Sequence, residues 1–183
     1  MADGLRESTV AVFGSSQTRA DEPDYAAAIR CGRLLAESGF RVATGGYSGL
    51  MEAVSRGAAD AGGTVIAATA PELFPDRAGA NRWAHIERPQ PTLPLRLSQL
   101  LDNSVATIAL PGSIGTLTEL MVAWNASFID ALTRRPPRPV IAVGPRWSSL
   151  VAHIAAEVQS SVELVTRVDD VDAAVAAVIA GTR

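Results

Sequence analysis

The segment with the clearest chemical potential is a glycine-bearing loop from Leu110 to Thr116, with the sequence LPGSIGT, directly before a predicted helix. Its glycines allow backbone N–H groups to approach an anion closely, and the positive end of the helix points to the same place. The Thr116 hydroxyl adds a donor, and Glu119 projects from the same side of the first helical turn. These features predict a phosphate site, with a nucleotide or sugar phosphate as the ligand.

A structural interpretation of the same residues stays open. Thr-x-x-Glu before an apolar run is also the pattern of a capping box, in which Thr116 and Glu119 would satisfy free N–H groups at a helix start. A second glycine loop, from Gly45 to Gly49, is likewise compatible with an ordinary tight turn between a strand and a helix. Neither motif alone decides between ligand binding and local structure.

The positions of the glycine loops favour binding. Three such loops follow predicted strands: one at Gly14 and Ser15, one at Gly45 and Gly46, and the loop that begins at Pro111. The carboxyl ends of parallel strands lie at one edge of a sheet, and ligands of such sheets bind there. We therefore expect the three loops to converge on one site.

Arg96 is a further candidate for that site. It lies in an otherwise apolar helical stretch, from Pro94 to Ser98, that leads into the strand before the phosphate loop. An isolated arginine in such a stretch is compatible with a solvated or snorkelling side chain. A guanidinium near a phosphate-binding edge is equally suited to recognise an anion.

Strands and helices alternate along the chain. Short continuous apolar runs predict buried strands, and apolar residues at helical spacing predict the helices between them. We expect strands at residues 9–13, 41–43, 64–68, 105–110, 140–143 and 162–166. We expect helices at residues 25–38, 48–61, 92–103, 115–131, 148–159 and 169–180, and an irregular loop over residues 71–91 with a short extended piece at 83–86. This order predicts an α/β fold, a doubly wound parallel sheet with helices on both faces.

The bulk composition predicts a single domain over residues 1–183, with residues 1–8 as a disordered tail. A chain of 183 residues with 48% hydrophobic content can bury one core. The net charge of −3 and the pI of 5.4 give no electrostatic footprint for nucleic acid, which is not expected as a partner. No segment has the roughly 18 continuous apolar residues of a membrane span, and residues 1–8 contain no apolar signal core, so we expect a cytoplasmic protein with no membrane partner.

Missing residue types exclude several chemistries. The chain has no lysine, which excludes a P-loop and a pyridoxal phosphate enzyme. The two histidines, His85 and His153, are far apart and lack a ligand spacing, so a structural zinc site has no ligand set, and a carboxylate-held ion has no support in the sequence. No metal and no cofactor are expected. The single cysteine, Cys31, rules out an intrachain disulfide and lies in a helical pattern that favours a buried structural thiol.

Two motifs together make a resemblance specific. The segment from Gly45 to Met51 reads GGYSGLM, and the segment from Pro111 to Glu119 reads PGSIGTLTE. These resemble the GGxxGxM and PGGxGTxxE motifs of the Lonely Guy (LOG) family, and the similarity spans nearly the whole chain. The resemblance implies a Rossmann-like fold and hydrolysis of the N-glycosidic bond of cytokinin nucleoside 5′-monophosphates, or of AMP, to free base and ribose 5-phosphate.

The resemblance also implies roles for individual residues. It places catalysis at Arg96 and Glu119. It implies that substrate and phosphate are bound by residues of the three glycine loops, namely Gly14, Ser15, Gly45, Gly46, Met51, Gly112, Ser113, Gly115 and Thr116. A homodimer is expected as well, because members of the family are usually dimeric through helices near the site. The helix that follows Gly115 is apolar on more than one side, in agreement with this expectation.

Two departures from the family pattern leave a second function open. Ser113 stands where the family has the second glycine of PGGxGTxxE, and Leu97 stands where it has the lysine of an Arg-Lys pair. A non-catalytic carrier or sensor on the same scaffold, similar to the molybdenum-cofactor carrier proteins, is therefore the alternative. The family's old label of lysine decarboxylase does not fit, because the chain lacks the lysine that would hold pyridoxal phosphate.

Overall fold

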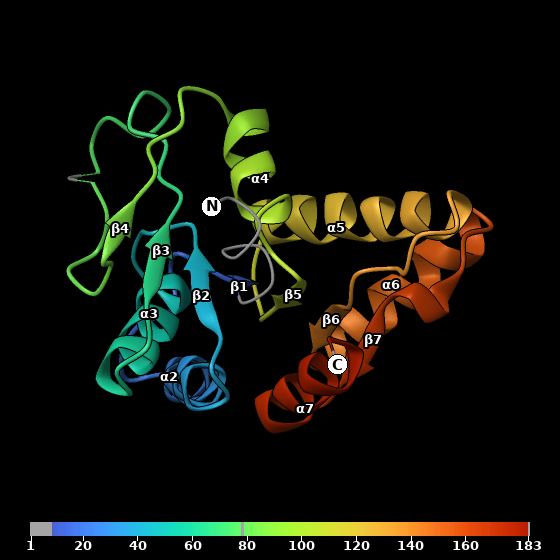
Figure 1. Cartoon of the computed structure of the whole chain (residues 1–183), viewed down its shortest axis with the longest axis horizontal. Helices are drawn as coiled ribbons and strands as arrows, with labels where there is room; N and C mark the ends of the chain where they lie inside the picture. Colours follow the sequence, from blue (N-terminus) through green and yellow to red (C-terminus); the bar gives the residue numbers. More distant parts are fainter. Residues whose placement is uncertain (1–8, 78, 183) are drawn as a thin grey trace.

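The central feature of the fold is a parallel β-sheet of seven strands (Figure 1). The computed structural model describes residues 9–77 and 79–182, so the tail predicted at residues 1–8 lies outside the described residues. The strand order is β4-β3-β2-β1-β5-β6-β7. The strands are β1 (Thr9–Phe13), β2 (Arg41–Thr44), β3 (Val65–Ala67), β4 (Ile86–Glu87), β5 (Ala106–Ala109), β6 (Val140–Val143) and β7 (Thr166–Val168).

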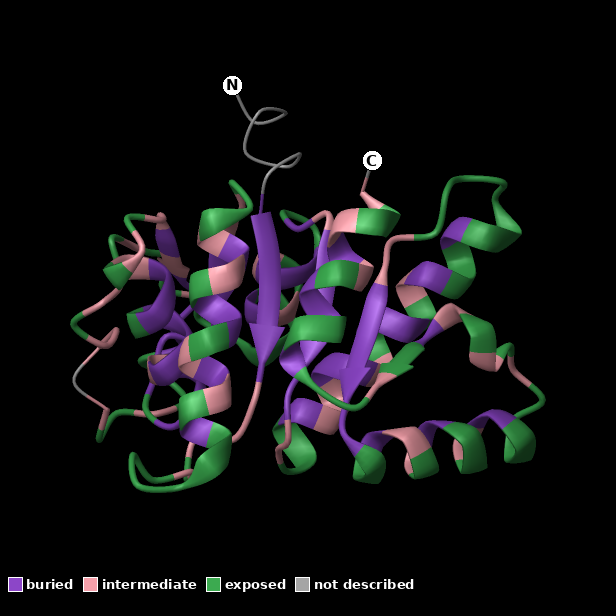
Figure 2. Ribbon diagram, turned by 90° about the horizontal axis from the view of Figure 1, so that it is seen from below, coloured by how far each residue is buried: buried purple, intermediate pink, exposed green. Residues whose placement is uncertain are grey.

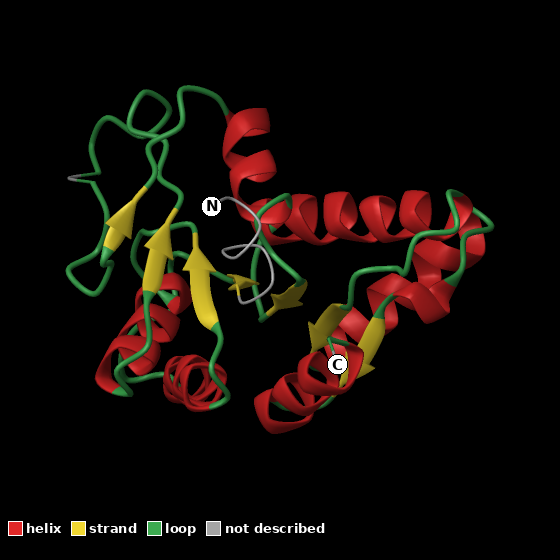
Figure 3. Cartoon of the chain, in the orientation of Figure 1, coloured by secondary structure: helices red, strands yellow, loops and turns green. Residues whose placement is uncertain are grey.

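Six α-helices of the described chain cover the two faces of this sheet (Figure 3). Side chains of α2 (Pro23–Glu37), α3 (Leu50–Asp60) and α7 (Val171–Gly181) form one core, in which Cys31 is fully buried as predicted. Side chains of α4 (Leu93–Leu101), α5 (Ile114–Leu132) and α6 (Pro145–Glu157) form a second core. The predicted α/β fold, a doubly wound parallel sheet with helices on both faces, is confirmed.

The central strand β1 contributes to both cores. Val10 and Val12 pack with the layer of α2, α3 and α7, whereas Ala11 and Phe13 pack with the layer of α4, α5 and α6. Figure 2 shows the same arrangement across the molecule, with buried strands between helices whose outer surfaces are exposed. Because both faces of β1 are covered, its sequence is a continuous apolar run without the alternation of a half-exposed strand.

The winding of the chain reverses at β1. The chain places β2, β3 and β4 on one side of β1 and then returns to place β5 on the other side. In this pairing Phe13 lies opposite Ala109, so the loops that follow β1 and β5 start side by side. Open α/β sheets bind their ligands at such a switch point, beyond the carboxyl ends of the strands.

The strand predicted at residues 162–166 is wrong. Its first residues form a 3₁₀ turn, η1 (Val162–Leu164), and one residue separates this turn from β7 (Thr166–Val168). Val162 and Leu164 pack against the core of α5 and α6, so their apolar character reflects core packing. As an edge strand, β7 has two exposed residues and needs no apolar run.

The helix predicted from residue 148 begins three residues earlier, at Pro145. Proline is favoured at the first helical position, because its φ is already helical and its missing N–H would have no partner there. Gly144 precedes it with a φ of +96°, a conformation that glycine adopts without strain. The Gly-Pro pair therefore marks a helix start in this chain, although it resembles a turn signal.

Candidate functional site

Three glycine loops meet at the carboxyl edge of the sheet, where β1, β2 and β5 end. The backbone N–H of Ser15 donates to the carbonyl of Pro111 at 3.0 Å, and the N–H of Leu50 donates to the carbonyl of Ser15 at 2.8 Å. Gly14 lies against Leu50, since a Cβ on this glycine would come within 2.8 Å of the Leu50 Cβ. Backbone contacts thus hold the loops together, and the convergence expected from the sequence is confirmed.

The loop after β5 leads directly into α5, which begins at Ile114 with Ser113 as its N-cap. The Ser113 side chain makes no capping hydrogen bond. The first N–H groups of a helix have no partner within the helix, so they are available to another acceptor. Ser113, Ile114 and Gly115 are exposed, and Gly112 lies so close to the Thr116 hydroxyl that a Cβ would overlap it. This backbone is open to an anion in the positive field of a 19-residue helix.

The capping-box interpretation of Thr116 and Glu119 is wrong. Because α5 begins at Ile114, Thr116 is its third residue and Glu119 lies in its second turn. Both residues are buried instead of turning to the helix terminus. The early start follows from the extended backbone of Ser113, which places the N-cap three residues before Thr116.

Arg96 is fixed inside the protein by backbone carbonyl groups. This residue of α4 is 7% exposed, and its Nε and Nη2 donate to the carbonyls of Ala68 at 2.8 Å and Gly45 at 3.2 Å. Thr92 sets the start of α4, because its hydroxyl accepts a hydrogen bond from the N–H of Leu95. A solvated or snorkelling Arg96 is therefore excluded.

Glu119 faces Arg96 across the site. Arg96 Nη1 lies 3.7 Å from Glu119 Oε1, which is an ion pair but is too long for a hydrogen bond. No residue within 9–77 or 79–182 donates a hydrogen bond to this carboxylate. Burial raises the pKa of Glu119 to about 7, partly opposed by the charge of Arg96, and burial lowers the pKa of Arg96. A carboxyl group with such a pKa can give or take a proton near neutral pH.

The second glycine loop forms a wall of the space that holds Arg96. A Cβ on Gly45 would overlap the Arg96 guanidinium and would come within 2.6 Å of Met51 Sδ. Gly46 has a φ of +79°, in the left-handed region that favours glycine. Gly45 and Met51 thus shape the room for the guanidinium, a supporting contact that the motif itself did not reveal.

The irregular loop over residues 71–91 closes against the second glycine loop. Asn81 donates from Nδ2 to the carbonyls of Gly46 at 3.1 Å and Tyr47 at 3.2 Å, and its backbone N–H donates to Gly46 at 2.7 Å. The Tyr47 ring in turn lies 5.7 Å from the Arg96 guanidinium carbon. Sequence reasoning missed Asn81 and Tyr47, because neither periodicity nor motif distinguishes an asparagine inside a proline-rich loop.

The described part of the chain contains neither a metal-ligand cluster nor a membrane-spanning helix. Within it, no three histidine, cysteine, aspartate or glutamate side chains are grouped so that they could hold a metal ion. Its helices are also too short or too polar for a membrane crossing.

Fold and site together define a class of protein. A doubly wound parallel sheet, with glycine loops and an open helix start at its switch point, defines a Rossmann-like α/β protein, a class whose ligands bind at the carboxyl edge. The family can be stated more narrowly, because the model of the SLOG cluster4 family matches residues 7–175. The chain belongs to this LOG-like family, in agreement with the resemblance of its motifs.

Two curated proteins are similar to the chain over part of its length. An uncharacterized protein from Archaeoglobus fulgidus is 32% identical over 115 residues, which cover 62% of this chain and 72% of that protein. A rice protein (Oryza sativa subsp. japonica), named a probable cytokinin riboside 5′-monophosphate phosphoribohydrolase, LOG4, is 32% identical over 120 residues, or 63% of this chain. The match spans about half of the rice protein, 51% of its length.

Two solved structures have the same fold over nearly the whole chain. The molybdenum cofactor binding protein of Rippkaea orientalis has a TM-score of 0.76 and 22% identity, with 96% of this chain and 97% of that one covered. The molybdenum cofactor carrier protein of Chlamydomonas reinhardtii has a TM-score of 0.74 and 23% identity, with 96% and 98% covered. At this level of identity the similarity shows the shared fold.

Proposed function

We propose that this protein hydrolyses the N-glycosidic bond of a nucleoside 5′-monophosphate, such as AMP or a cytokinin riboside monophosphate, and releases free base and ribose 5-phosphate. The observation that carries the proposal is the buried ion pair of Arg96 and Glu119 at the carboxyl edge of the sheet. Glu119 lies on α5, the helix whose open start is the candidate phosphate site. The name of the rice relative states this activity and supports the choice of substrate class.

The 5′-phosphate would bind at the start of α5. Backbone N–H groups from Gly112 to Thr116 would donate to its oxygens, and the helix dipole would favour its charge. Gly14 and Ser15 border the same place through the contact of Ser15 with Pro111. A phosphate held here fixes the ribose relative to Glu119, which lies one turn further along the same helix.

Glu119 is proposed to act on the water that attacks the ribose. The bond between C1′ and the base nitrogen breaks while a C–O bond to water forms, and positive charge develops on the ribose. The ionised Glu119 carboxylate would stabilise this charge and accept the proton of the water, and the base nitrogen would then take up a proton as the base leaves. Arg96 is proposed to hold the carboxylate in place and to favour its ionised form.

The rate should follow the ionisation of Glu119. Because the ionised form is proposed to be active and the pKa of this group is about 7, kcat/KM should rise with pH up to about 7 and then level off. Initial rates of base release between pH 5 and pH 9 measure this profile. A rate that does not change across this range would contradict the role of Glu119 as a base.

The proposal is tested by incubation of the purified protein with AMP and, separately, with a cytokinin riboside monophosphate. Chromatography of the products should show free base and ribose 5-phosphate from at least one of them. The variant Glu119→Gln is the matched control, because it keeps the size of the side chain and removes its charge. Saturable nucleotide binding without any base release would refute the hydrolase.

A second candidate function is a non-catalytic carrier of a nucleotide or phosphorylated cofactor. The observation in its favour is the shared fold: the molybdenum-cofactor proteins match 96% of this chain with TM-scores of 0.76 and 0.74. The open start of α5 would hold the phosphate of a carried ligand equally well. Binding without turnover in the same assay is the result that this function predicts.

Exposed apolar side chains on α4 and α5 support the further proposal of a homodimer. Large apolar residues with substantial exposure lie along these two helices, from the candidate site to the far end of α5: Leu93, Leu95, Ile114, Val122, Phe128, Ile129 and Leu132. Exposed apolar surface of this kind is commonly covered by a partner. Light scattering at micromolar concentration should give about twice the chain mass of 19.1 kDa, and a monomeric mass would contradict the proposal.

A further inference from the structure

A second pocket lies against the glycine loop 45–49. It has a volume of about 350 Å³ and is lined by Tyr47, Ser48, Glu52, Arg77, Gly79, Asn81 and Arg82. Tyr47 connects this pocket to the candidate active site, because its ring is also near the Arg96 guanidinium. The pocket is not used by the proposed hydrolysis.

Arg77 and Arg82 bring two guanidinium groups to this pocket. The Arg77 guanidinium carbon lies 4.5 Å from the ring centres of both Tyr47 and Phe74, and that of Arg82 lies 4.7 Å from the ring centre of Trp83. Stacking covers the flat face of a guanidinium and leaves its N–H edge free to donate. Within the described ranges, none of the ion pairs and none of the side-chain hydrogen bonds involves either guanidinium.

Residues next to the two arginines are held in place. The N–H of Ala70 donates to the Tyr47 hydroxyl at 2.7 Å, and the rings of Tyr47 and Phe74 meet edge to face at 5.5 Å. Asn81, between the two arginines in sequence, is bonded to the glycine loop through both its side chain and its backbone. These contacts anchor the segments next to the two arginines, and stacking on aromatic rings restricts the arginine side chains, which reduces the entropy lost on binding.

We propose that Arg77 and Arg82 form a second anion-binding subsite, which takes a phosphate group. Guanidinium edges match the spacing of phosphate oxygens and form strong charge-assisted hydrogen bonds with them. Glu52 is the one carboxylate among the lining residues, so the lining side chains carry a net positive charge. This inference goes beyond the proposed function, since it concerns phosphate binding and requires no bond cleavage.

Trp83 provides a local signal for a test. Its ring is stacked with Arg82, whereas Trp124 and Trp147 are buried in the core of α5 and α6. Titration of the purified protein with inorganic phosphate should give a saturable change in tryptophan fluorescence, which disappears in the variant Trp83→Phe. Isothermal titration calorimetry of the same samples measures the affinity without the fluorophore.

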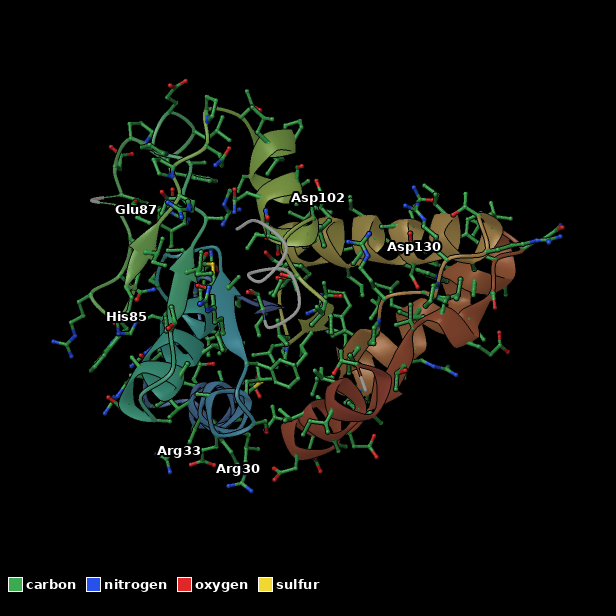
Figure 4. The ribbon with its side chains drawn as sticks, in the orientation of Figure 1. Arg30, Arg33, His85, Glu87, Asp102 and Asp130 are labelled. Carbon is green, nitrogen blue, oxygen red and sulfur yellow. The ribbon has the colours of Figure 1, made fainter. Side chains whose placement is uncertain are left out.

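Charge variants give the subsite an electrostatic signature. Arg77→Gln and Arg82→Gln should each weaken phosphate binding by about tenfold, the effect of one lost charge-assisted hydrogen bond. Glu52→Gln should strengthen it by roughly two- to threefold, because a repulsive charge is removed. The matched control is Arg33→Gln, an equal change of charge at an exposed position of α2 (Figure 4), which should leave the affinity unchanged.

The proposal is overturned if phosphate gives no saturable signal, or if Arg77→Gln and Arg82→Gln bind phosphate as well as the unmodified protein. Arg82 is exposed, so its variant should fold even if the loss of Arg77 from the Tyr47 and Phe74 rings destabilises the loop. Circular dichroism checks the fold of each variant. Because no base release is measured, a failure of the hydrolase proposal leaves this test valid.

The phosphate could be a second group on the ligand held at α5 or part of a separate compound. Adenosine 3′,5′-bisphosphate carries two phosphates and distinguishes these cases. If Arg82→Gln lowers its affinity about tenfold and leaves the affinity for AMP unchanged, a single ligand that spans the start of α5 and the pocket of Arg77 and Arg82 is supported. Independent binding of AMP and inorganic phosphate would support two ligands. Equal weakening of AMP and inorganic phosphate in Arg82→Gln would contradict a separate subsite.

Discussion

The two ends of α5 hold buried carboxylates in contrasting surroundings. Near the start of the helix, Glu119 faces Arg96 at 3.7 Å and accepts no hydrogen bond from the described chain. Near its end, Asp130 (Figure 4) accepts a hydrogen bond from Arg138 Nε at 3.2 Å and pairs with Arg135 Nη2 at 3.0 Å. Both carboxylates are more than nine-tenths buried.

The arginines at the two ends differ in what they bind. Arg138 donates from Nη1 to the carbonyl of Leu101 at 2.9 Å, so Asp130 and Arg138 tie the segment after α5 to the end of α4. Arg96 gives its hydrogen bonds to backbone carbonyls and leaves the Glu119 oxygens without one. A carboxylate with its oxygens bonded stabilises the fold, whereas one without such bonds is available to water or a ligand.

The largest expected effect is on catalysis. Glu119→Gln should lower the rate of base release by about a hundredfold or more, the typical contribution of a general base. Asp130→Asn should retain nearly the full rate, because Asp130 lies at the other end of α5. Steady-state kinetics of both variants, with the nucleoside monophosphate that the unmodified protein hydrolyses fastest, measures the two rates. Equal losses of rate in the two variants would contradict a catalytic role for Glu119 that Asp130 does not share.

For stability, Asp130→Asn should have the larger effect of the two substitutions. Asp130→Asn should lower the free energy of unfolding by about 2 kcal/mol, because two arginines lose their charged partner. Glu119→Gln should not lower it at pH 7, because no hydrogen bond is lost and the variant no longer buries an ionised carboxylate. Urea unfolding followed by circular dichroism compares them. A larger loss in Glu119→Gln would show that Glu119 is mainly structural.

A further effect is expected on the pH dependence of stability. Burial raises the pKa of Glu119 from 4.5 to about 7 in the folded state, so between these values the folded protein binds more protons than the unfolded chain. Its contribution to stability is full below about pH 4.5 and is lost as the pH rises through about 7. Between pH 5 and pH 8 the unmodified protein should lose roughly 2 to 3 kcal/mol more than Glu119→Gln. Parallel curves for the two proteins would show that the pKa of Glu119 is not raised.

Much of the fold could be predicted because local pattern and tertiary role agree. The run from Thr9 to Phe13 is apolar on both faces, as a central parallel strand requires, and β1 occupies these residues. The disagreements arose at the edge of the sheet and at a helix start. The apolar residues from Val162 to Val165 pack into the core without pairing, and a helix begins at Pro145, three residues before its predicted start.

The candidate site could be predicted in part, for a similar reason. Glycine loops after strands lie at one edge in any parallel sheet, so the placement of Gly14, Gly45 and Pro111 at that edge required only that the strands be parallel. The conformation of Arg96 did not follow from its sequence neighbours. Its hydrogen bonds go to Ala68 and Gly45, which are distant in sequence and lie near it only in the folded chain.

The sequence by itself determined the alternation of strands and helices, the edge at which a ligand would bind, and the residue types that could do chemistry there, because these depend on periodicity and on glycine. Only the tertiary structure decided between a helix cap and a buried carboxylate at Glu119, since that choice depends on where α5 begins and on what surrounds its second turn. The tertiary structure likewise assembled the pocket of Arg77 and Arg82. Stacking of arginine on aromatic rings in a loop follows no sequence periodicity, so it could not be predicted from a sequence pattern.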